Sequence, residues 1–149
     1  MKKFNFSLEK VSNTKAIRLK NKSQELAKLL SSLENEELRL KDLDAELTSL
    51  HDEVLHRTID GCSAKELRDY HRYLDKLTVE MQAQKKSIDS IQEKIEEHQA
   101  GLMELSKEKK VLEKLREKRY LKHLQEQARE EQKILDEMSI VSRGIKNLL

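Results

Sequence analysis

Apolar residues recur along the first third of the chain with a period of seven residues. One series takes every seventh position, at Leu19, Leu26, Leu33, Leu40, Leu47 and Val54. A second series lies three residues further on, at Leu29, Glu36, Leu43 and Leu50. Two interleaved series of this kind form the apolar seam of a coiled-coil helix, with charged residues on the faces between them. The pattern predicts a long helix over about residues 7–57, with Glu36 as the one polar member of its seam.

The seam stops at residues 58–63, which read TIDGCS. Gly61 suits the left-handed backbone conformation that often follows the end of a helix. Ser63 and Glu66 have the spacing of a capping box, in which each side chain accepts a hydrogen bond from the other residue's free backbone N–H group. A helix end and a helix start this close together predict a tight helical hairpin.

A second helix is expected over about residues 64–146, and it carries a seam of its own. The seam residues are Leu67, Tyr70, Leu74, Leu77, Met81, Ile88, Ile91, Ile95, Leu102 and Leu105. Gln84 and His98 interrupt this seam, as polar residues that fix the register of a coiled coil often do. Near residues 107–122 the register slips, and a new phase begins at Leu121. The sequence therefore predicts an all-α fold: an antiparallel two-helix coiled-coil hairpin with a longer C-terminal helix, forming one domain over residues 1–149.

The two predicted arms differ in length, which leaves part of the second helix without a partner. With a turn centred near Gly61, Ser7 lies opposite Lys114, so the chain after about Lys114 extends past the first helix. That overhang still carries apolar residues at helical spacing, namely Leu121, Leu124, Leu135, Met138, Val141, Ile145 and Leu148. An apolar stripe left in water usually marks an interaction surface. We therefore expect a binding partner for the C-terminal helix, or for both chain ends together.

Charge narrows the class of protein further. Charged residues make up 39% of the chain, but they nearly balance, with a net charge of +2. Nucleic-acid binders usually carry a dominant basic field, so we expect no nucleic-acid partner. The one concentrated basic run lies between Lys107 and Lys122, where eight basic residues accompany three acidic ones. It is either a solvated helix face with local ion pairs or a docking site for an acidic protein surface.

No motif in the sequence points to catalysis or to a cofactor. There is no glycine-rich phosphate loop or nucleophile motif, and His56, Cys62 and His71 near the turn lack the spacing of a zinc site. We expect neither an enzyme nor a metal site. No apolar run matches a signal peptide or a membrane span, so we expect a cytoplasmic protein without direct membrane insertion. Tyr73, beside the seam near the hairpin tip, is either a flank of the core or a binding anchor.

The two ends of the chain resemble the FliJ family, the soluble coiled-coil component of the flagellar type III export apparatus. Residues 4–11 read FNFSLEKV, like the start of that family, and depart from it at residues 12–14 (SNT). Residues 112–119 (LEKLREKR) and 131–138 (EQKILDEM) are similar to its C-terminal pattern. The resemblance implies a role like that of the central stalk of a rotary ATPase. The chain ends would enter the pore of the hexameric export ATPase, the tip would contact the export gate in the membrane, and export chaperones would also bind.

The resemblance also implies roles for particular residues. Those expected to face the ATPase are Lys114, Arg116, Lys118, Arg119, Leu121, Leu124, Gln132, Leu135 and Met138. Those expected to face the export gate are Tyr70, Tyr73 and Leu77. The protein would then work at the inner face of the cell membrane. Two alternatives stay open: the equivalent stalk of a virulence type III secretion system, and a structural coiled coil that pairs with itself through the overhang.

Overall fold

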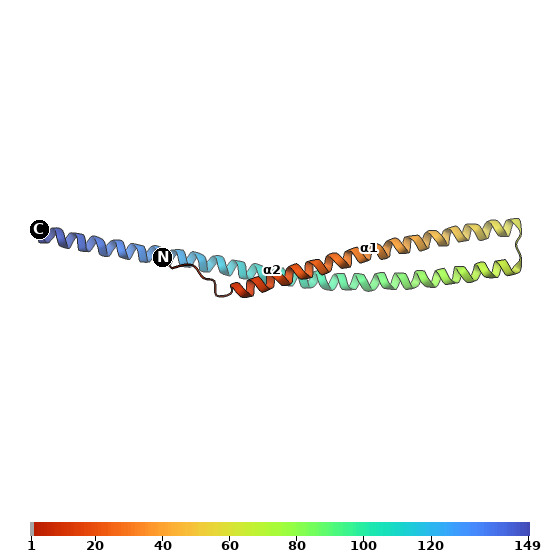
Figure 1. Ribbon diagram of the computed structural model, residues 1–149, viewed down its shortest axis with the longest axis horizontal. Helices are drawn as coiled ribbons and strands as arrows, with labels where there is room; N and C mark the ends of the chain where they lie inside the picture. Colours follow the sequence, from red (N-terminus) through yellow and green to blue (C-terminus); the bar gives the residue numbers. More distant parts are fainter. Residues whose placement is uncertain (1) are drawn as a thin grey trace. The chain divides into compact units, whose positions relative to one another are not determined.

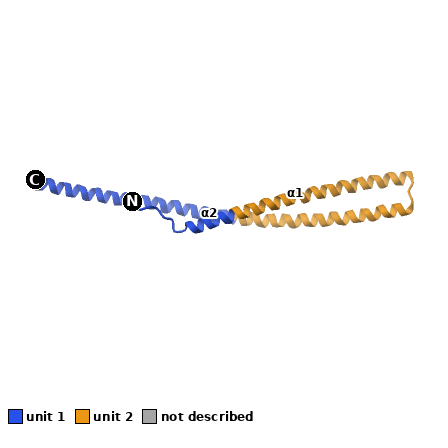
Figure 2. Ribbon diagram, viewed as in Figure 1, with its two compact units in different colours: residues 1–19, 104–149 blue, residues 20–103 orange. Residues whose placement is uncertain are grey.

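Two long helices make up nearly all of the structure. The computed structural model describes residues 2–149, in which α1 spans Glu9–Asp60 and α2 spans Ala64–Leu148 (Figure 1). No strand occurs in this range, and neither helix contains an apolar stretch that could span a bilayer. The chain divides into two units, one of residues 20–103 and one of residues 2–19 with 104–149 (Figure 2). The prediction of an all-α chain with two long helices is confirmed.

In the unit of residues 20–103, α1 and α2 pack side by side and run in opposite directions. Near the connection, Tyr70 of α2 bonds to Glu53 of α1, and at the other end of the unit His98 of α2 contacts Glu25 of α1. The most buried cluster consists of Leu50, Leu74 and Leu77. Every predicted seam position of this unit is buried or half-buried, which confirms the seven-residue pattern.

Residues 61–63 connect the two helices. Gly61 has a φ of +93°, the left-handed conformation that was expected at this position. The Ser63 hydroxyl oxygen accepts a hydrogen bond from the Glu66 N–H group at 3.2 Å and so caps the start of α2. The predicted glycine turn is therefore present, and the Ser63 half of the predicted capping box is present as well.

The first helix ends three residues later than expected. It continues to Asp60, so three residues that were expected to lie in the turn are helical. Thr58 remains helical, with its hydroxyl donating to the Val54 carbonyl of the preceding turn at 2.7 Å. The change of direction is made at Gly61, the only residue in the described chain with a positive φ. The turn is therefore shorter than the predicted range of residues 58–63.

The polar interruptions of the two seams meet each other in this unit. Gln84 is 7% exposed, and its amide nitrogen donates to the Glu36 backbone carbonyl at 2.9 Å and to the Glu36 carboxylate. A shift of one helix by seven residues would place the buried amide opposite Leu29 or Leu43. Such a shift would leave a buried polar group unsatisfied, which costs about 1–3 kcal/mol. The pair therefore favours a single register, as expected for Gln84.

In the other unit, the chain before α1 lies against α2 in extended form. We call residues 2–6 the N-terminal strap, which Figure 2 shows alongside α2 within the blue unit. Phe6 anchors the strap and is only 3% exposed. The Phe6 carbonyl accepts a hydrogen bond from the Glu9 N–H group at 3.1 Å. The helix α1 begins at Glu9, two residues after its expected start.

The strap changes where the uncovered part of α2 begins. The Ser7 hydroxyl accepts a hydrogen bond from Arg119, not from a residue near Lys114, at 2.8 Å. The Lys2 carbonyl accepts one from the Gln127 amide at 2.9 Å. An extended chain advances about 3.3 Å per residue and a helix about 1.5 Å, so the short N-terminal segment covers about two turns of α2, from Arg119 to Gln127. The prediction that α2 has no partner after Lys114 is therefore wrong, because the uncovered part begins after Gln127.

Candidate functional site

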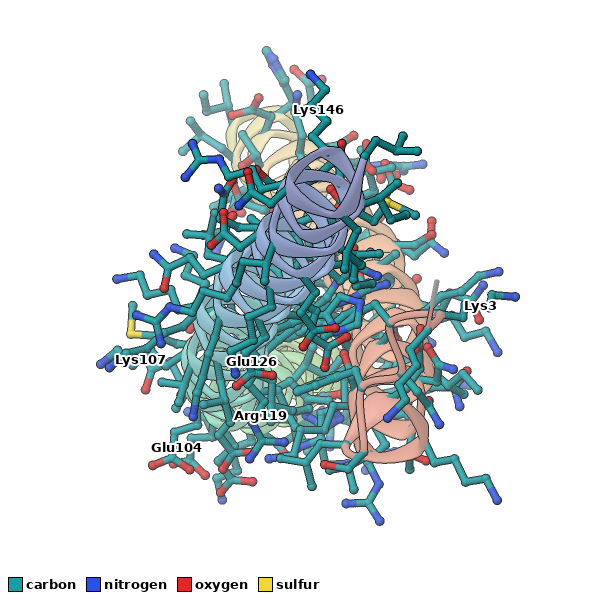
Figure 3. All side chains as sticks on the ribbon, turned by 90° about the vertical axis from the view of Figure 1, so that its left-hand side faces the viewer. Lys3, Glu104, Lys107, Arg119, Glu126 and Lys146 are labelled. Atoms are coloured by element: carbon teal, nitrogen blue, oxygen red, sulfur yellow. The ribbon has the colours of Figure 1, made fainter. Side chains whose placement is uncertain are left out.

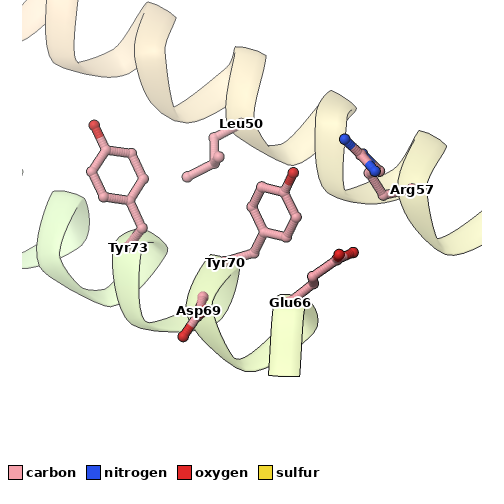
Figure 4. A pocket seen from close by; sticks show the side chains of 6 residues that line it. All are labelled: Leu50, Arg57, Glu66, Asp69, Tyr70 and Tyr73. Carbon is pink, nitrogen blue, oxygen red and sulfur yellow. The ribbon is translucent and has the colours of Figure 1, made fainter. Parts of the chain in front are cut away.

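Two tyrosines of α2 line a shallow groove near the connection. The groove has a volume of about 440 Å³ and is lined by Leu50, Arg57, Glu66, Asp69, Tyr70 and Tyr73 (Figure 4). The Tyr70 hydroxyl donates to the Glu53 carboxylate at 3.0 Å, and the Tyr73 hydroxyl donates to the Glu46 carboxylate. Both bonds run from α2 to α1, and both rings lie on the side of α2 that faces Leu50 (Figure 4). The groove thus holds two aromatic rings in fixed orientations.

The carboxylates that accept these bonds raise the pKa of both phenols. The hydrogen bond to Glu53 is the main cause of the raised pKa of Tyr70, and desolvation adds to it. The hydrogen bond to Glu46 has the same effect on the pKa of Tyr73. A hydroxyl that donates to an anion is stabilised in its protonated form. Both tyrosines are therefore neutral hydrogen-bond donors near neutral pH.

Leu77, the third residue expected to face the export gate, is not brought to this surface. It is 2% exposed and packs between the helices with Leu50 and Leu74. A partner could not touch its side chain while α1 and α2 remain packed. The structure therefore separates Leu77 from the two tyrosines, and its role in gate binding stays a prediction.

Apart from Lys109, which lies 3.9 Å from the Glu113 carboxylate, the basic run on α2 divides into two groups. Arg116 lies 3.7 Å from the Glu9 carboxylate, and the Arg119 guanidinium lies 5.5 Å from the centre of the Phe6 ring, within the range of a cation–π interaction. These two arginines hold the N-terminal residues against α2. Five lysines are exposed and form no ion pair with any residue from 2 to 149: Lys107, Lys110, Lys114, Lys118 and Lys122. Figure 3 shows Lys107 on the opposite side of α2 from Lys3.

An aromatic cluster beneath the strap was missed from sequence. Phe4 packs edge-on against Tyr120, with ring centres 5.2 Å apart, and its ring centre lies 5.5 Å from that of His123. The one signal for this cluster is that both phenylalanines of the chain, Phe4 and Phe6, lie within its first six residues. Together with the bond from Gln127 to the strap, the cluster covers one face of α2 over about two turns.

After Gln127, the same face of α2 carries an uncovered aliphatic row. We call it the C-terminal stripe, and it consists of Ile134, Met138, Val141, Ile145 and Leu148. These residues lie three or four positions apart, which places them on one side of a helix. A shallow groove along this side is lined by Ile134, Glu137, Met138, Val141, Ser142, Ile145 and Lys146. The sequence prediction of an exposed apolar overhang included all of the stripe except Ile134.

The remaining residues expected to face the ATPase lie on exposed faces of α2, both before and after Gln127. Leu121, Leu124, Leu135 and Met138 are all exposed. Gln132 lies among them, and its amide donates to the Asp136 carboxylate at 3.0 Å. The whole expected set is therefore exposed, and its two arginines also contact the N-terminal end of the chain.

These features define an all-helical protein of two long packed helices, with exposed helix faces that fit the binding of other proteins. The model of the family described as Flagellar FliJ protein matches residues 4–144, nearly the whole chain. The chain belongs to the FliJ family, which confirms the resemblance at its two ends and implies a component of the flagellar protein export apparatus. No curated protein and no solved structure matches the chain.

Proposed function

We propose that the chain is an antiparallel coiled-coil hairpin that serves as a stalk of the flagellar export apparatus. It binds the hexameric export ATPase through its chain ends and the export gate through residues near the connection, and it also binds export chaperones. It acts through binding, not catalysis, as one domain in the cytoplasm at the inner face of the cell membrane. The observation that carries the proposal is the exposed C-terminal stripe, in a chain that belongs to the FliJ family.

Support for a coiled coil comes from residues 20–103. The buried positions there follow the seven-residue seam on both helices. The contact between Gln84 and Glu36 joins the polar positions of the two seams, and polar pairs of this kind set register in coiled coils. A hairpin of this type transmits force or position along its length because its helices are held in one register.

We assign ATPase binding to α2 between Lys114 and Met138. Lys114 and Lys118 point into solvent, where they would steer the chain toward an acidic protein surface. The apolar contacts would come from Leu121, Leu124, Leu135 and Met138, with Gln132 beside them. Arg116 and Arg119 would act indirectly, because their contacts with Glu9 and Phe6 hold the N-terminal end in place.

We assign gate binding to the groove lined by Tyr70 and Tyr73 near the connection, which we call the tip groove. Tyr70 and Tyr73 are oriented by bonds to α1, so a partner meets them without the entropic cost of fixing the rings. Tyrosine is one of the residues that most often anchors a protein interface. Leu77 would contribute by packing the helices beneath the groove.

The ATPase role is tested by the rate of ATP hydrolysis of the cognate export ATPase, titrated with three forms of this protein. The full chain should stimulate hydrolysis. A form that ends after Gln127 keeps every residue that contacts the strap and should lose the stimulation, because it lacks the stripe. Met138→Asp should lose it as well. Ile140→Asp is the matched control, since Ile140 is 69% exposed but lies off the stripe.

Each outcome has a distinct meaning for the ATPase role. Equal stimulation by all forms would place the working surface before residue 128. Absence of both stimulation and complex formation with the full chain would contradict the ATPase role itself.

The gate role is tested by the affinity of the solubilised export gate protein for point variants of the tip groove. Tyr73→Ala should weaken binding by about tenfold or more, as expected for an aromatic anchor. Val79→Ala is the control, because Val79 is exposed on α2 outside the groove. Wild-type affinity for Tyr73→Ala and Tyr70→Ala would remove the groove from the gate contact.

A further inference from the structure

Charged residues are distributed unevenly along the segment that carries the C-terminal stripe. Residues 128–138 contain two basic and four acidic side chains, a net side-chain charge of −2. Residues 139–149 contain two basic side chains, Arg143 and Lys146, and no acidic ones, a net side-chain charge of +2. The segment is therefore neutral as a whole, with opposite charges on its two halves. A surface of this kind is complementary to a copy of itself that runs in the opposite direction.

The stripe itself favours a helical partner with the same spacing. Met138 is 65% exposed and Val141 is 61% exposed, although both lie on the face that the strap covers further upstream. Aliphatic residues three and four positions apart bury most of their surface when they interlock with an identical row on a second helix. Burial of this surface would remove apolar area from water, which is favourable.

We propose that a second copy of this chain covers the stripe, with the two C-terminal segments paired in antiparallel. In this orientation, the acidic half of each segment lies against the basic half of the other. In the parallel orientation, like-charged halves would lie together and Glu131 would face Glu131 of the second copy. Like charges in direct apposition are unfavourable. The charge pattern therefore selects the antiparallel arrangement.

The position of the strap also favours the antiparallel arrangement. It covers α2 at Tyr120, His123 and Gln127, on the face that continues into the stripe. A parallel partner would have to leave this face where the strap begins. An antiparallel pair centred between Ser139 and Ile140 joins residues 131–148 of the two copies, and this range lies outside the turns that the strap covers. The two copies can therefore pair over this range while each strap stays in place.

Helical spacing determines which residues meet in this pair. The apolar layers join Met138 to Val141 and Ile134 to Ile145 of the second copy, each twice by symmetry. Glu131 lies beside Lys146 of the second copy at both ends. Pairing covers the stripe, so it competes with any partner that binds the same face, including the ATPase under the proposed function. The pairing itself needs only this protein and does not depend on the ATPase role.

The first test is the molar mass of the full chain in sedimentation equilibrium, measured from micromolar to millimolar concentration under reducing conditions. The wild-type mass should rise with concentration from 17.5 kDa toward twice that value. Val141→Asp should remain a monomer throughout, whereas Ile140→Asp should dimerise like the wild type. These neighbouring substitutions introduce the same charge into side chains of similar exposure, so they differ only in the helix face. The proposal would be overturned if the wild type stayed a monomer at all concentrations. It would also be overturned if both variants lost dimerisation to the same extent.

The second test distinguishes the antiparallel pair from a parallel one. Glu131→Lys and Lys146→Glu should each weaken dimerisation by about fivefold, as expected for two exposed ion pairs. The double variant restores both pairs in the antiparallel dimer and should recover wild-type affinity. A double variant that is as weak as either single variant would overturn the antiparallel arrangement. ATPase stimulation measured on the same variants reports on the proposed function separately, since either activity can fail while the other is retained.

Discussion

The part of α2 that faces α1 and the part after Gln127 have the same kind of sequence but opposite surroundings. Both carry aliphatic residues three or four positions apart on one face of the helix. Leu77 is 2% exposed because α1 packs against it, whereas Met138 is 65% exposed because no other described residue covers it. A seven-residue seam therefore specifies a surface that can be buried, and a separate feature of the chain or of its partner decides whether it is.

The sharpest way to test this contrast is to shorten one side chain in each part. Leu77→Ala should lower the free energy of unfolding by about 3 kcal/mol, through lost apolar burial and the cavity that remains. Met138→Ala should change it by less than about 0.5 kcal/mol at low protein concentration, because its side chain is already in water. Denaturant unfolding followed by circular dichroism measures both. Similar losses for the two variants would mean that residues after 127 are packed within the monomer.

A second substitution tests whether the strap belongs with the packed part. Phe6→Ala should weaken the attachment of the strap to α2 by about 2 kcal/mol. This is somewhat less than the cost of removing a phenylalanine from a full protein core, because Phe6 packs at the edge of one helix. Amide hydrogen exchange of residues 2–12 should speed up while residues 20–103 keep their protection. Phe6→Leu, which keeps most of the apolar volume, should give a smaller change. Unchanged exchange in both variants would contradict the anchoring role of Phe6.

A third change tests the polar layer inside the packed part. Gln84→Ala should lower the free energy of unfolding by about 1 kcal/mol, because the Glu36 groups lose their amide partner. Replacing both Glu36 and Gln84 by Leu should raise it instead, since a continuous apolar seam replaces a partly buried carboxylate. Denaturant titration gives the stabilities. Equal stabilities for the wild type and the double variant would show that the polar pair costs nothing.

The smallest effect concerns the ionisation of the tip tyrosines. Their pKa values lie above the ordinary value of 10.0, so the folded state favours the protonated phenols. The stabilisation is fully present below about pH 10 and is lost as the pH rises through the raised pKa values. Glu46→Gln should lower the pH at which Tyr73 ionises, measured by tyrosinate absorbance in a Tyr70→Phe, Tyr120→Phe background. An unchanged midpoint would mean that the Glu46 bond does not set this pKa.

Most of the packed part could be predicted from sequence, for a physical reason. In a two-helix pair with a short connection, the seven-residue seam fixes both which residues are buried and which residues face each other. The pairing of Gln84 with Glu36 obeys the same rule, because their midpoint lies at residue 60, beside the connection. The sequence predicts Gln84 and Glu36 as polar interruptions of their own seams, and their contact with each other was not predicted.

The strap could not be predicted in the same way. It has no repeat, and its contacts join residues more than a hundred positions apart, such as Ser7 and Arg119. The assumption of equal advance along both arms failed there because the chain before Glu9 is extended and not helical. For the same reason, Arg116 and Arg119 were grouped with the exposed lysines, although the structure turns them toward the N-terminal residues.

The contact between Gln84 and Glu36 also restricts how the length of this protein can change through insertions and deletions. Loss of seven residues between the contact and the connection in one arm alone would move the amide away from its partner. Loss of seven residues from both arms would keep the polar pair, the seams and the Gly61 turn together. Related chains of different length are therefore expected to differ by seven residues, or a multiple of seven, in both arms. The length of the helix pair would then vary in steps of about 10 Å.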